Sequence, residues 1–322
     1  MGAGHRLSHS DRSVKVTEAS WTKGPPKKLL LATDLSARCD RATDRAALLS
    51  RQWQAPLHVL HVLNPAERFI EQRQLDDLPS WRRPRDRKAL AEARLRRDLA
   101  GHLDHFTLTV AEGDPAAMID EVARTEGCDL IITGIARDET LGRYFLGATV
   151  DRLIRRATVP VLVVKARARS YQEIVIATDF SESSRHALNA AAAFFPDTTL
   201  TLFHAFDVPM AAFLDDAGLQ DQFRTMGQQA CDRFLAQSAL GEDRKRAVTT
   251  LVEYGRPEIM IRAYMEDRGA GLVCLGSHGR SGILDVLIGS TARKIVEFSP
   301  GDVLLVREPR AALIGRNADG DA

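Results

Sequence analysis

The sequence of 322 residues has few cysteines, and no two of them lie close together. Cys39, Cys128, Cys231 and Cys274 form no CxxC pair, which argues against a structural zinc site and against a disulfide framework. Because this usage suits a reducing compartment, we expect a cytoplasmic protein. Cys274 lies in an apolar run, so we expect it to fill the core rather than to act as a nucleophile.

The sequence also lacks long apolar runs and an excess of either charge. No run approaches the roughly 18 apolar residues that a membrane span requires, and residues 1–10 contain no apolar signal region. The formal net charge is only +1, so no overall field draws the chain toward nucleic acid or an anionic membrane. The basic cluster at Arg82–Lys88 is more typical of a solvated helix face than of a nucleic-acid contact. We therefore expect neither nucleic acid nor a membrane as a partner.

The residues that are present suit a folded protein of two domains. Hydrophobic residues make up 44% of the chain and charged residues 27%, which is typical of globular proteins. A length of 322 residues favours two domains. The polar ends of the chain, 1–26 and 309–322, predict flexible tails.

Short apolar runs alternate with segments of helical spacing in the first part of the chain. Strands are predicted at 28–34, 57–62, 106–110, 129–133 and 159–164, and helices at 36–52, 95–103, 115–125 and 149–156. Residues 134–147 are predicted to be a loop. Strands that alternate with helices favour a parallel sheet built from βαβ units.

The same pattern restarts in the second part of the chain. The run EIVIATDFS at 173–181 repeats KLLLATDLS at 28–36, so that Asp179 corresponds to Asp34. Further along, Gly276 follows its predicted strand as Gly134 does in the first part. Self-similarity at a fixed offset indicates tandem units, which explains the length without a second fold class.

The predicted units are residues 27–165 and residues 171–308. The linker between them, 166–170, is short and polar, which favours two units packed side by side. The fifth strands of the two units, 161–164 and 303–306, are candidates for sheet edges, and unpaired edges invite pairing.

A glycine-rich segment follows the fourth predicted strand of the second unit. It contains Gly276, Gly279 and Gly289, and a short helix is predicted after it. Glycines with positive φ let the backbone approach an anion, and Ser290 or Thr291 can cap the helix, whose N-terminus favours negative charge. The segment therefore predicts a phosphate cradle. A glycine-punctuated surface loop with a capped helix is the alternative interpretation.

Asp179 ends the first predicted strand of the second unit, and Gly276 ends the fourth. In an open parallel sheet, ligands bind at the carboxyl ends of the strands where the strand order reverses. A carboxylate there accepts hydrogen bonds from ribose hydroxyls while the glycine loop holds phosphates, which is the division of roles that a nucleotide requires. From the residues alone, Asp179 or Ser181 could instead cap the following helix.

These residues carry a resemblance to a known family. The pattern Gly276-x2-Gly279-x9-Gly289-Ser290, with Asp179 upstream, resembles the universal stress protein family, and residues 27–308 resemble a tandem member. The resemblance implies two Rossmann-like (adenine nucleotide α-hydrolase-like) α/β domains, each a five-stranded parallel sheet flanked by helices. The sequence contains no GxxxxGK[ST] P-loop, and the glycine spacing does not fit the dinucleotide-binding GxGxxG.

The resemblance also implies roles for residues of the second unit. ATP-binding members use the strand-end aspartate, here Asp179, for adenosine, and a residue at the end of the second strand, here Ala205, near adenine. The implied phosphate contacts come from the loop residues Gly276, Gly279, Gly289 and Ser290, followed by Thr291. His278 and Arg280 lie in the same loop and could add charge. The expected cofactor is ATP, with any Mg²⁺ carried by the phosphates.

The first unit departs from this pattern. Arg137 stands in the place of the second loop glycine, where it should obstruct phosphates, and Ala148 replaces the loop serine. Thr149 remains as a hydroxyl donor, while Asp34 and Val62 keep the strand-end positions. We therefore hypothesise that the first unit binds ATP poorly or not at all and serves as a structural or regulatory partner.

The sequence contains no catalytic constellation. No Ser-His-Asp set, metal-ligand spacing, general base or arginine finger is evident, so we expect no enzyme and no efficient ATP hydrolysis. His61 and His204 lie on apolar strands and are predicted to be packed core residues.

The expected protein is an ATP-binding universal stress protein that acts as a nucleotide-dependent regulator of stress survival. The family resemblance suggests that its two units meet through their fifth strands, and we expect a homodimer of the tandem chain. One alternative is a nucleotide-free interaction scaffold. An adenine-nucleotide-hydrolysing enzyme of the related α-hydrolase group, such as an ATP-dependent ligase, is disfavoured. Those enzymes usually carry a Ser-Gly-Gly phosphate loop near the first strand, where this chain has Asp179-Phe-Ser-Glu.

Overall fold

The computed structural model describes residues 24–34, 39–65, 87–103, 105–138, 143–206, 217–277 and 288–307. The strands of its main sheet are β1 (Leu29–Ala32), β2 (Leu57–Leu63), β3 (Phe106–Glu112), β4 (Leu130–Gly134), β7 (Val161–Val164), β8 (Glu173–Ala177), β9 (Thr199–Phe206), β10 (Thr249–Tyr254), β11 (Leu272–Gly276) and β12 (Asp302–Val306). The described helices are α1 (Asp40–Trp53), α3 (Arg87–Leu99), α4 (Pro115–Thr125), α5 (Ala148–Arg156), α6 (Glu182–Phe194), α7 (Ala217–Ala236), α8 (Glu242–Ala247), α9 (Pro257–Arg268) and α10 (Ser290–Phe298). The predicted tails, apart from residues 24–26, lie outside the described residues.

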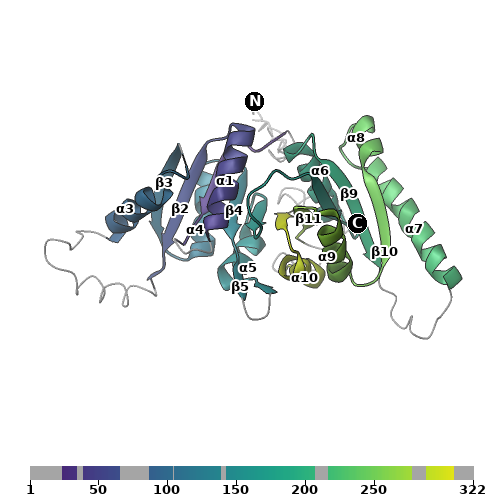
Figure 1. The fold of residues 1–322 in the computed structure, drawn as a ribbon. Helices are drawn as coiled ribbons and strands as arrows, with labels where there is room; N and C mark the ends of the chain where they lie inside the picture. Colours follow the sequence, from purple (N-terminus) through teal and green to yellow (C-terminus); the bar gives the residue numbers. More distant parts are fainter. Residues whose placement is uncertain are drawn as a thin grey trace, which may run out of the picture.

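Ten strands form one continuous sheet in the order β10-β9-β8-β11-β12-β7-β4-β1-β2-β3. Within each half of the chain the strands are parallel, and the first strand lies between the second and the fourth. The central strands β1, β4, β7 and β12 are buried along their whole length, as expected for strands covered by helices on both faces. The α/β fold with two Rossmann-like halves is confirmed, and the halves lie side by side (Figure 1).

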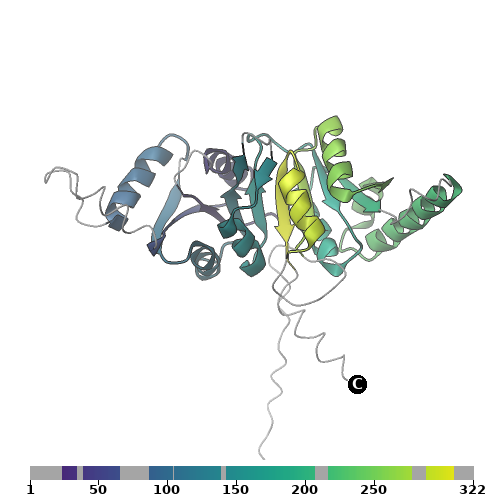
Figure 2. The same ribbon diagram turned by 90° about the horizontal axis from the view of Figure 1, so that it is seen from below.

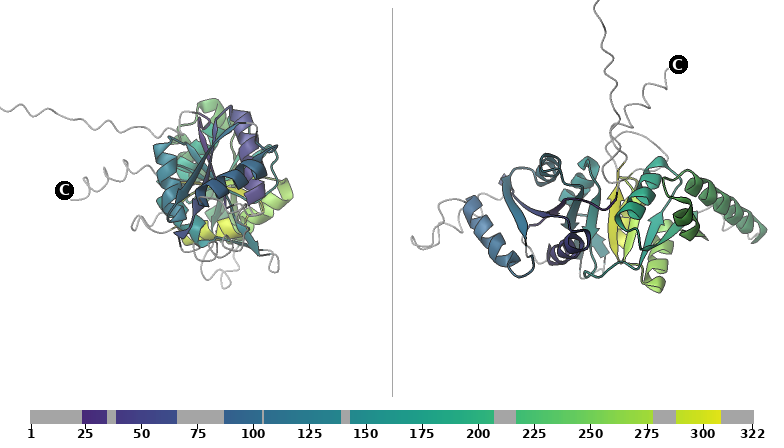
Figure 3. Two further views of the ribbon diagram at one scale, coloured as in Figure 1. Left: turned by 90° about the vertical axis from the view of Figure 1, so that its left-hand side faces the viewer. Right: turned by 90° about the horizontal axis from the view of Figure 1, so that it is seen from above.

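The two faces of the sheet are covered by different helices. Because successive side chains on a strand point to opposite faces, Leu29 and Leu31 belong to one buried cluster and Leu30 to the other. Helices α1, α3, α6 and α7 contribute to the first cluster, and α4, α5, α9 and α10 to the second. Both clusters contain residues of both halves, so the core continues across the middle of the molecule. Figures 1 and 3 show the helices that flank the sheet in both halves.

The fifth strands of the two halves meet in the centre. Strand β12 pairs with β7 in antiparallel register, with Val303 opposite Val163 and Leu305 opposite Val161. Figure 2 shows the yellow β12 and α10 in the middle of the molecule. The prediction that the units meet through these strands is confirmed, and the outer edges of the sheet are β3 and β10. A single chain does not test the expected homodimer.

A buried carboxylate joins the linker to both halves. Asp302, at the start of β12, is fully buried and accepts hydrogen bonds from the backbone N–H groups of Lys165 and Ala166, both at 2.8 Å. Tyr171 Oη donates to Asp302 Oδ2 at 2.6 Å, and Arg45 Nε from α1 lies 2.9 Å from the same oxygen. One side chain therefore ties the end of the first half to the start of the second.

The segment predicted as a loop at 134–147 contains a hairpin. Strands β5 (Ala136–Asp138) and β6 (Arg143–Phe145) pair in antiparallel register, with Arg137 opposite Tyr144. The aromatic residues Tyr144 and Phe145 favour extended backbone, and Arg137 and Thr140 stand where the second unit has Gly279 and Gly282. The prediction of an irregular loop was therefore wrong for the described part of this segment.

Candidate functional site

A cavity of about 360 Å³ opens at the carboxyl ends of the strands in the second half. It lies where the strand order reverses, between β8 and β11, which is the ligand-binding position of open α/β sheets. We call it the second-half pocket. Its lining comprises Ala177, Thr178, Asp179, Ser184, Phe203, His204, Ala205, Pro257, Ile261, Leu275, Gly276, Gly289, Ser290, Thr291, Ala292 and Ile295.

Residues that were predicted from three distant parts of the chain lie together in this pocket. Those that line it are Asp179, Ala205, Gly276, Gly289, Ser290 and Thr291. The other predicted site residues, His278, Gly279 and Arg280, lie outside the described residues. The fold thus brings the described candidates to one cavity.

The turn after β8 holds Asp179 in a fixed position. Thr178 Oγ1 accepts a hydrogen bond from the Phe180 N–H at 2.9 Å, and Phe180 has the left-handed φ of 65°. Asp179 Oδ1 accepts from the Ser181 N–H at 3.0 Å. The cap of α6 is Ser181, whose hydroxyl accepts from the Ser184 N–H at 3.2 Å. Asp179 therefore orders its own turn while Ser181 caps the helix, and Asp179 is half-buried in the lining of the pocket.

Gly276 is required by packing within the protein. A Cβ atom at this position would lie 2.4 Å from Ser183 Oγ and 2.6 Å from the Ser183 carbonyl carbon. The first turn of α6 therefore packs against the backbone at the end of β11. The expected positive φ is absent at Gly276, and at Gly289 φ is −55°, so that expectation was wrong for the described loop glycines.

The N-terminus of α10 forms one wall of the pocket. Its cap is Gly289 and makes no side-chain hydrogen bond, while Ser290 and Thr291 are the first helical residues. The prediction that Ser290 or Thr291 caps this helix was therefore wrong. Because the cap has no side chain, it leaves the first-turn N–H groups available to an anion.

Several other residues of the lining are apolar, and one is a histidine. Phe203, Ile261 and Leu275 are buried and line the pocket. The ring centroids of His204 and Phe180 lie 4.3 Å apart, and His204 Nδ1 donates to the Thr178 carbonyl oxygen at 2.8 Å. His204 is half-buried in the pocket wall, so its prediction as a packed core residue was wrong.

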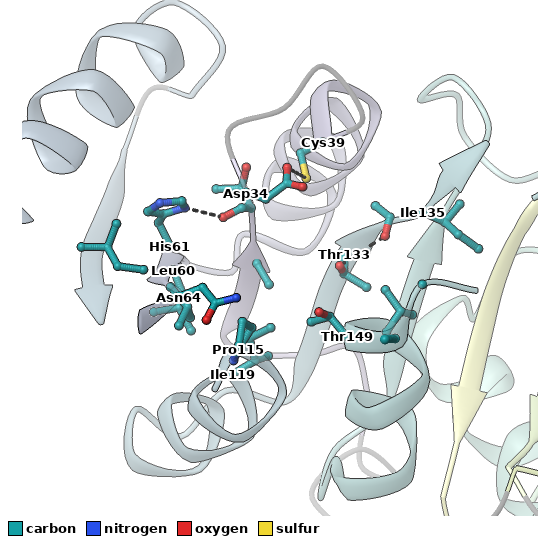
Figure 4. A pocket seen from close by; sticks show the side chains of 18 of the residues that line it. Asp34, Cys39, Leu60, His61, Asn64, Pro115, Ile119, Thr133, Ile135 and Thr149 are labelled. Atoms are coloured by element: carbon teal, nitrogen blue, oxygen red, sulfur yellow. Dashed lines mark hydrogen bonds between the residues drawn. The ribbon is translucent and has the colours of Figure 1, made fainter. Parts of the chain in front are cut away.

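The first half has a cavity at the equivalent position, of about 570 Å³ (Figure 4). We call it the first-half pocket. It is lined by Ala32, Thr33, Asp34, Cys39, Leu60, His61, Val62, Leu63, Asn64, Arg94, Pro115, Ile119, Thr133, Gly134, Ile135, Gly147, Ala148, Thr149 and Val150. His61 repeats the arrangement of His204, because its Nδ1 donates to the Thr33 carbonyl oxygen at 2.9 Å. His61 also lines a cavity rather than the core, contrary to its prediction.

The two pockets differ around the strand-end aspartate. Cys39 Sγ donates to Asp34 Oδ1 at 3.2 Å, and burial, followed by the Asp34 charge, raises the pKa of this thiol to about 11. Helix α5, at the first-half pocket, begins with Ala148, which has no hydroxyl group. The Arg137 side chain lies outside the described part of the structure, so its predicted obstruction stays a prediction.

The described residues include no group of three His, Cys, Asp or Glu side chains that could hold a metal ion. None of the described helices is long and apolar enough to cross a membrane. All four cysteines are buried and free, and Cys274 fills the core as predicted.

Several lining residues were missed by sequence reasoning. Thr178 belongs to the repeated Ala-Thr-Asp, and Pro257 to a repeated Gly-x-Pro, so the repeat itself pointed to both. Ile261 and Ile295 read only as apolar helix positions. Their role as pocket walls follows from how α9 and α10 pack on the sheet.

Comparison with known proteins identifies the family and the fold. The sequence matches the universal stress protein family over residues 26–165 and again over 170–307. A universal stress protein of Mycolicibacterium smegmatis is 24% identical over 299 residues, which are 87% of this chain and 96% of that protein.

Two solved structures align with nearly the whole chain. A functionally unknown protein from Pseudomonas aeruginosa PAO1 has a TM-score of 0.62 at 21% identity, covering 94% of this chain and 100% of that one. A universal stress protein from Archaeoglobus fulgidus DSM 4304 has a TM-score of 0.57 at 20% identity, covering 87% and 98%. These likenesses show the fold. Because the family match covers both halves, this chain belongs to the universal stress protein family and carries two of its domains in tandem.

Proposed function

We propose that this protein binds ATP in the second-half pocket and acts as a nucleotide-dependent regulator of stress survival. One observation carries the proposal: residues from β8, β9, β11 and α10, far apart in sequence, line one cavity at the switch point of the sheet. Membership of the universal stress protein family agrees with this role.

The pocket fits the parts of an adenine nucleotide. Asp179 is held by its turn where its carboxylate can accept hydrogen bonds from ribose hydroxyls. Ala205 and the buried Phe203 and Ile261 offer a small, apolar surface for the base. The N-terminus of α10, which begins at Ser290, offers N–H and hydroxyl donors to the phosphates.

The first-half pocket is proposed to bind ATP poorly or not at all. Its aspartate, Asp34, already accepts a hydrogen bond from the Cys39 thiol, and Ala148 supplies no hydroxyl group. We therefore propose that residues 27–165 serve as a structural or regulatory partner of the second half. The finding of an open cavity there makes this difference directly testable.

A binding and signalling role is proposed in preference to catalysis. Bound ATP changes a regulator only through unequal affinity for its conformations, and this needs no bond cleavage. Any Mg²⁺ is proposed to be carried by the phosphates. The proposed partners are the adenine nucleotide, a second copy of the chain and further proteins.

Calorimetric titration of ATP into the full-length protein tests the proposal. Hydrogen bonds to a charged group contribute about 1.5–3 kcal/mol, so Asp179→Ala should weaken ATP binding roughly 10- to 150-fold. Asp34→Ala is the matched control and should bind ATP like the wild type. Retained affinity in Asp179→Ala with loss in Asp34→Ala would place the site in the first half. Absence of ATP binding by the wild type would favour the nucleotide-free scaffold.

A further inference from the structure

Helix α10 joins the second-half pocket to the first half of the molecule. Its N-terminal residues line the pocket, while its other end lies against the end of β7. Lys165, directly after β7, donates from Nζ to the carbonyl oxygens of Val296 and, at 2.9 Å, Ser299. The Lys165 residue is only 1% exposed. A residue of the first half therefore holds the last turn of the pocket helix in the second half.

The reverse contact is also present. Arg307 follows β12 as Lys165 follows β7, at the same offset that separates Gly134 from Gly276. Arg307 Nη1 donates to the carbonyl oxygen of Arg155, in the last turn of α5. The antiparallel pairing of β7 and β12 explains this exchange, because it places the end of each strand beside the helix that precedes the other.

Two further contacts bind the helix ends together. Arg293 Nη1 on α10 lies 3.7 Å from Asp151 Oδ1 on α5, so the two pocket helices face each other across the boundary. The Tyr144 ring of β6 has its centroid 4.4 Å from Lys165 Nζ, so the hairpin of the first half covers the lysine. The first half therefore contacts α10 near its first turn through Asp151 and at its last turn through Lys165, against which Tyr144 lies.

We propose that Lys165 is a positioning residue of the second-half pocket, contributed by the first half. The last carbonyl groups of a helix have no partner within it, and donors placed there complete the helix end. A helix of this length moves as one rigid body, so the contact that fixes its last turn also fixes the N–H groups at its first. This inference rests on the proposed ATP site, and it makes that site dependent on both halves of the chain.

The chain contains a matched control for this contact. Lys28 Nζ donates to the carbonyl oxygen of Glu126 at 2.8 Å, at the end of α4. Both lysines therefore complete a helix end, but α4 belongs to the same half as Lys28 and does not line the second-half pocket. Loss of Lys28 removes a lysine contact at a more exposed helix end, where the Lys28 side chain is 27% exposed, and leaves α10 in place.

The test measures the ATP dissociation constant and the melting temperature of the full-length variants. Lys165→Met should weaken ATP binding about 5-fold or more, the lower range of coupling between sites. Lys165→Arg, which restores donors and matches Arg307 in the equivalent place, should bind close to the wild type. Lys28→Met should bind like the wild type, although it can lower the melting temperature.

The outcomes separate this inference from the proposed function. If the wild type binds no ATP, the proposed function fails and the inference fails with it. If the wild type binds ATP and a folded Lys165→Met binds it equally well, only the inference is overturned. If Lys165→Met does not fold, the inference is tested instead by hydrogen exchange of the wild type with and without ATP. ATP should slow exchange of the Ser299 and Lys165 N–H groups, and protection confined to the pocket lining contradicts the proposal.

Discussion

Gly276 ends β11, the fourth strand of its half, and Gly147 caps α5, the helix after the fourth strand of the other half, and their surroundings differ. A Cβ atom at Gly276 would meet the Ser183 backbone at 2.6 Å, whereas at Gly147 it would have nothing within 4 Å. Gly147 also has a φ of −59°, which any residue can adopt. The same residue type is therefore required by packing in one place and not in the other.

Gly276→Ala should lower the free energy of unfolding by about 1–3 kcal/mol, because the new methyl group displaces the start of α6. Gly147→Ala should leave it unchanged or raise it by up to about 1 kcal/mol, since the unfolded chain loses freedom. Urea unfolding of both variants measures the difference. Equal effects would show that the close contact at Gly276 is not what sets its residue type.

Lys165 should make stability depend on pH. Burial lowers the pKa of Lys165 from 10.5 to about 7, although the negative charges of Asp302 and Glu297 act to raise it. Between pH values of about 7 and 10.5 the unfolded chain binds more protons than the folded one, so the free energy of unfolding should rise with pH. The maximum slope is about 1.4 kcal/mol per pH unit.

Urea unfolding between pH 7 and about 8.5 measures this slope as the difference between the wild type and Lys165→Arg, because the cysteines of the unfolded chain, with a pKa of about 8.5, ionise in both proteins over this range. Lys165→Arg stays charged throughout and should lack the rise. A slope shared by the wild type and Lys165→Arg would assign the pH dependence to another group.

At the scale of single elements, two helices of the second half begin in different ways. Ser181 caps α6 through its hydroxyl group, which accepts from the Ser184 N–H at 3.2 Å. At α10 the cap is Gly289, and Ser290 is already the first helical residue. A Ser-Thr pair after a glycine is compatible with either start, so the sequence could not decide which residue caps.

Ser181→Ala should cost about 1 kcal/mol of stability, the usual contribution of a capping hydroxyl group. Ser290→Ala should change stability by less than about 0.5 kcal/mol, because its side chain makes no capping bond. Thermal unfolding of the two variants compares them. A larger loss in Ser290→Ala would mean that its hydroxyl group supports the helix.

The strands were predictable because they are buried on both faces and read as continuous apolar runs such as Leu29–Ala32. The site was predictable where the repeat marks a strand end, as at Asp179 and Gly276. The β5–β6 hairpin was not, because β6 lies against α10 of the other half, a contact that the local sequence does not reveal. His204 was misjudged because its position near the end of β9, rather than its apolar neighbours, decides its exposure.

At the scale of the whole molecule, one sheet and one buried carboxylate unite the two domains. Asp302 bonds to the Lys165 and Ala166 N–H groups and to Tyr171, and it pairs with Arg45 of the first half. Burial, followed by the charge of Asp302, raises the pKa of Tyr171 well above its usual value. The domains should therefore unfold as one cooperative unit.

Asp302→Ala should lower the free energy of unfolding by about 3–5 kcal/mol, because Arg45 is left buried without its partner. The control is Asp221→Ala on α7, whose side chain is 77% exposed and 3.8 Å from Arg224. An exposed pair contributes about 0–1 kcal/mol, so this variant should resemble the wild type. Equal stability of the two variants would contradict the role assigned to Asp302.

The central claim is a single ATP site, in the second half of the tandem chain. The most direct test is to release and count the adenine nucleotide in freshly purified protein, beside the Asp179→Ala and Asp34→Ala variants. We expect about one nucleotide per chain in the wild type and in Asp34→Ala, and loss of it in Asp179→Ala. Two nucleotides per chain, or loss only in Asp34→Ala, would contradict it.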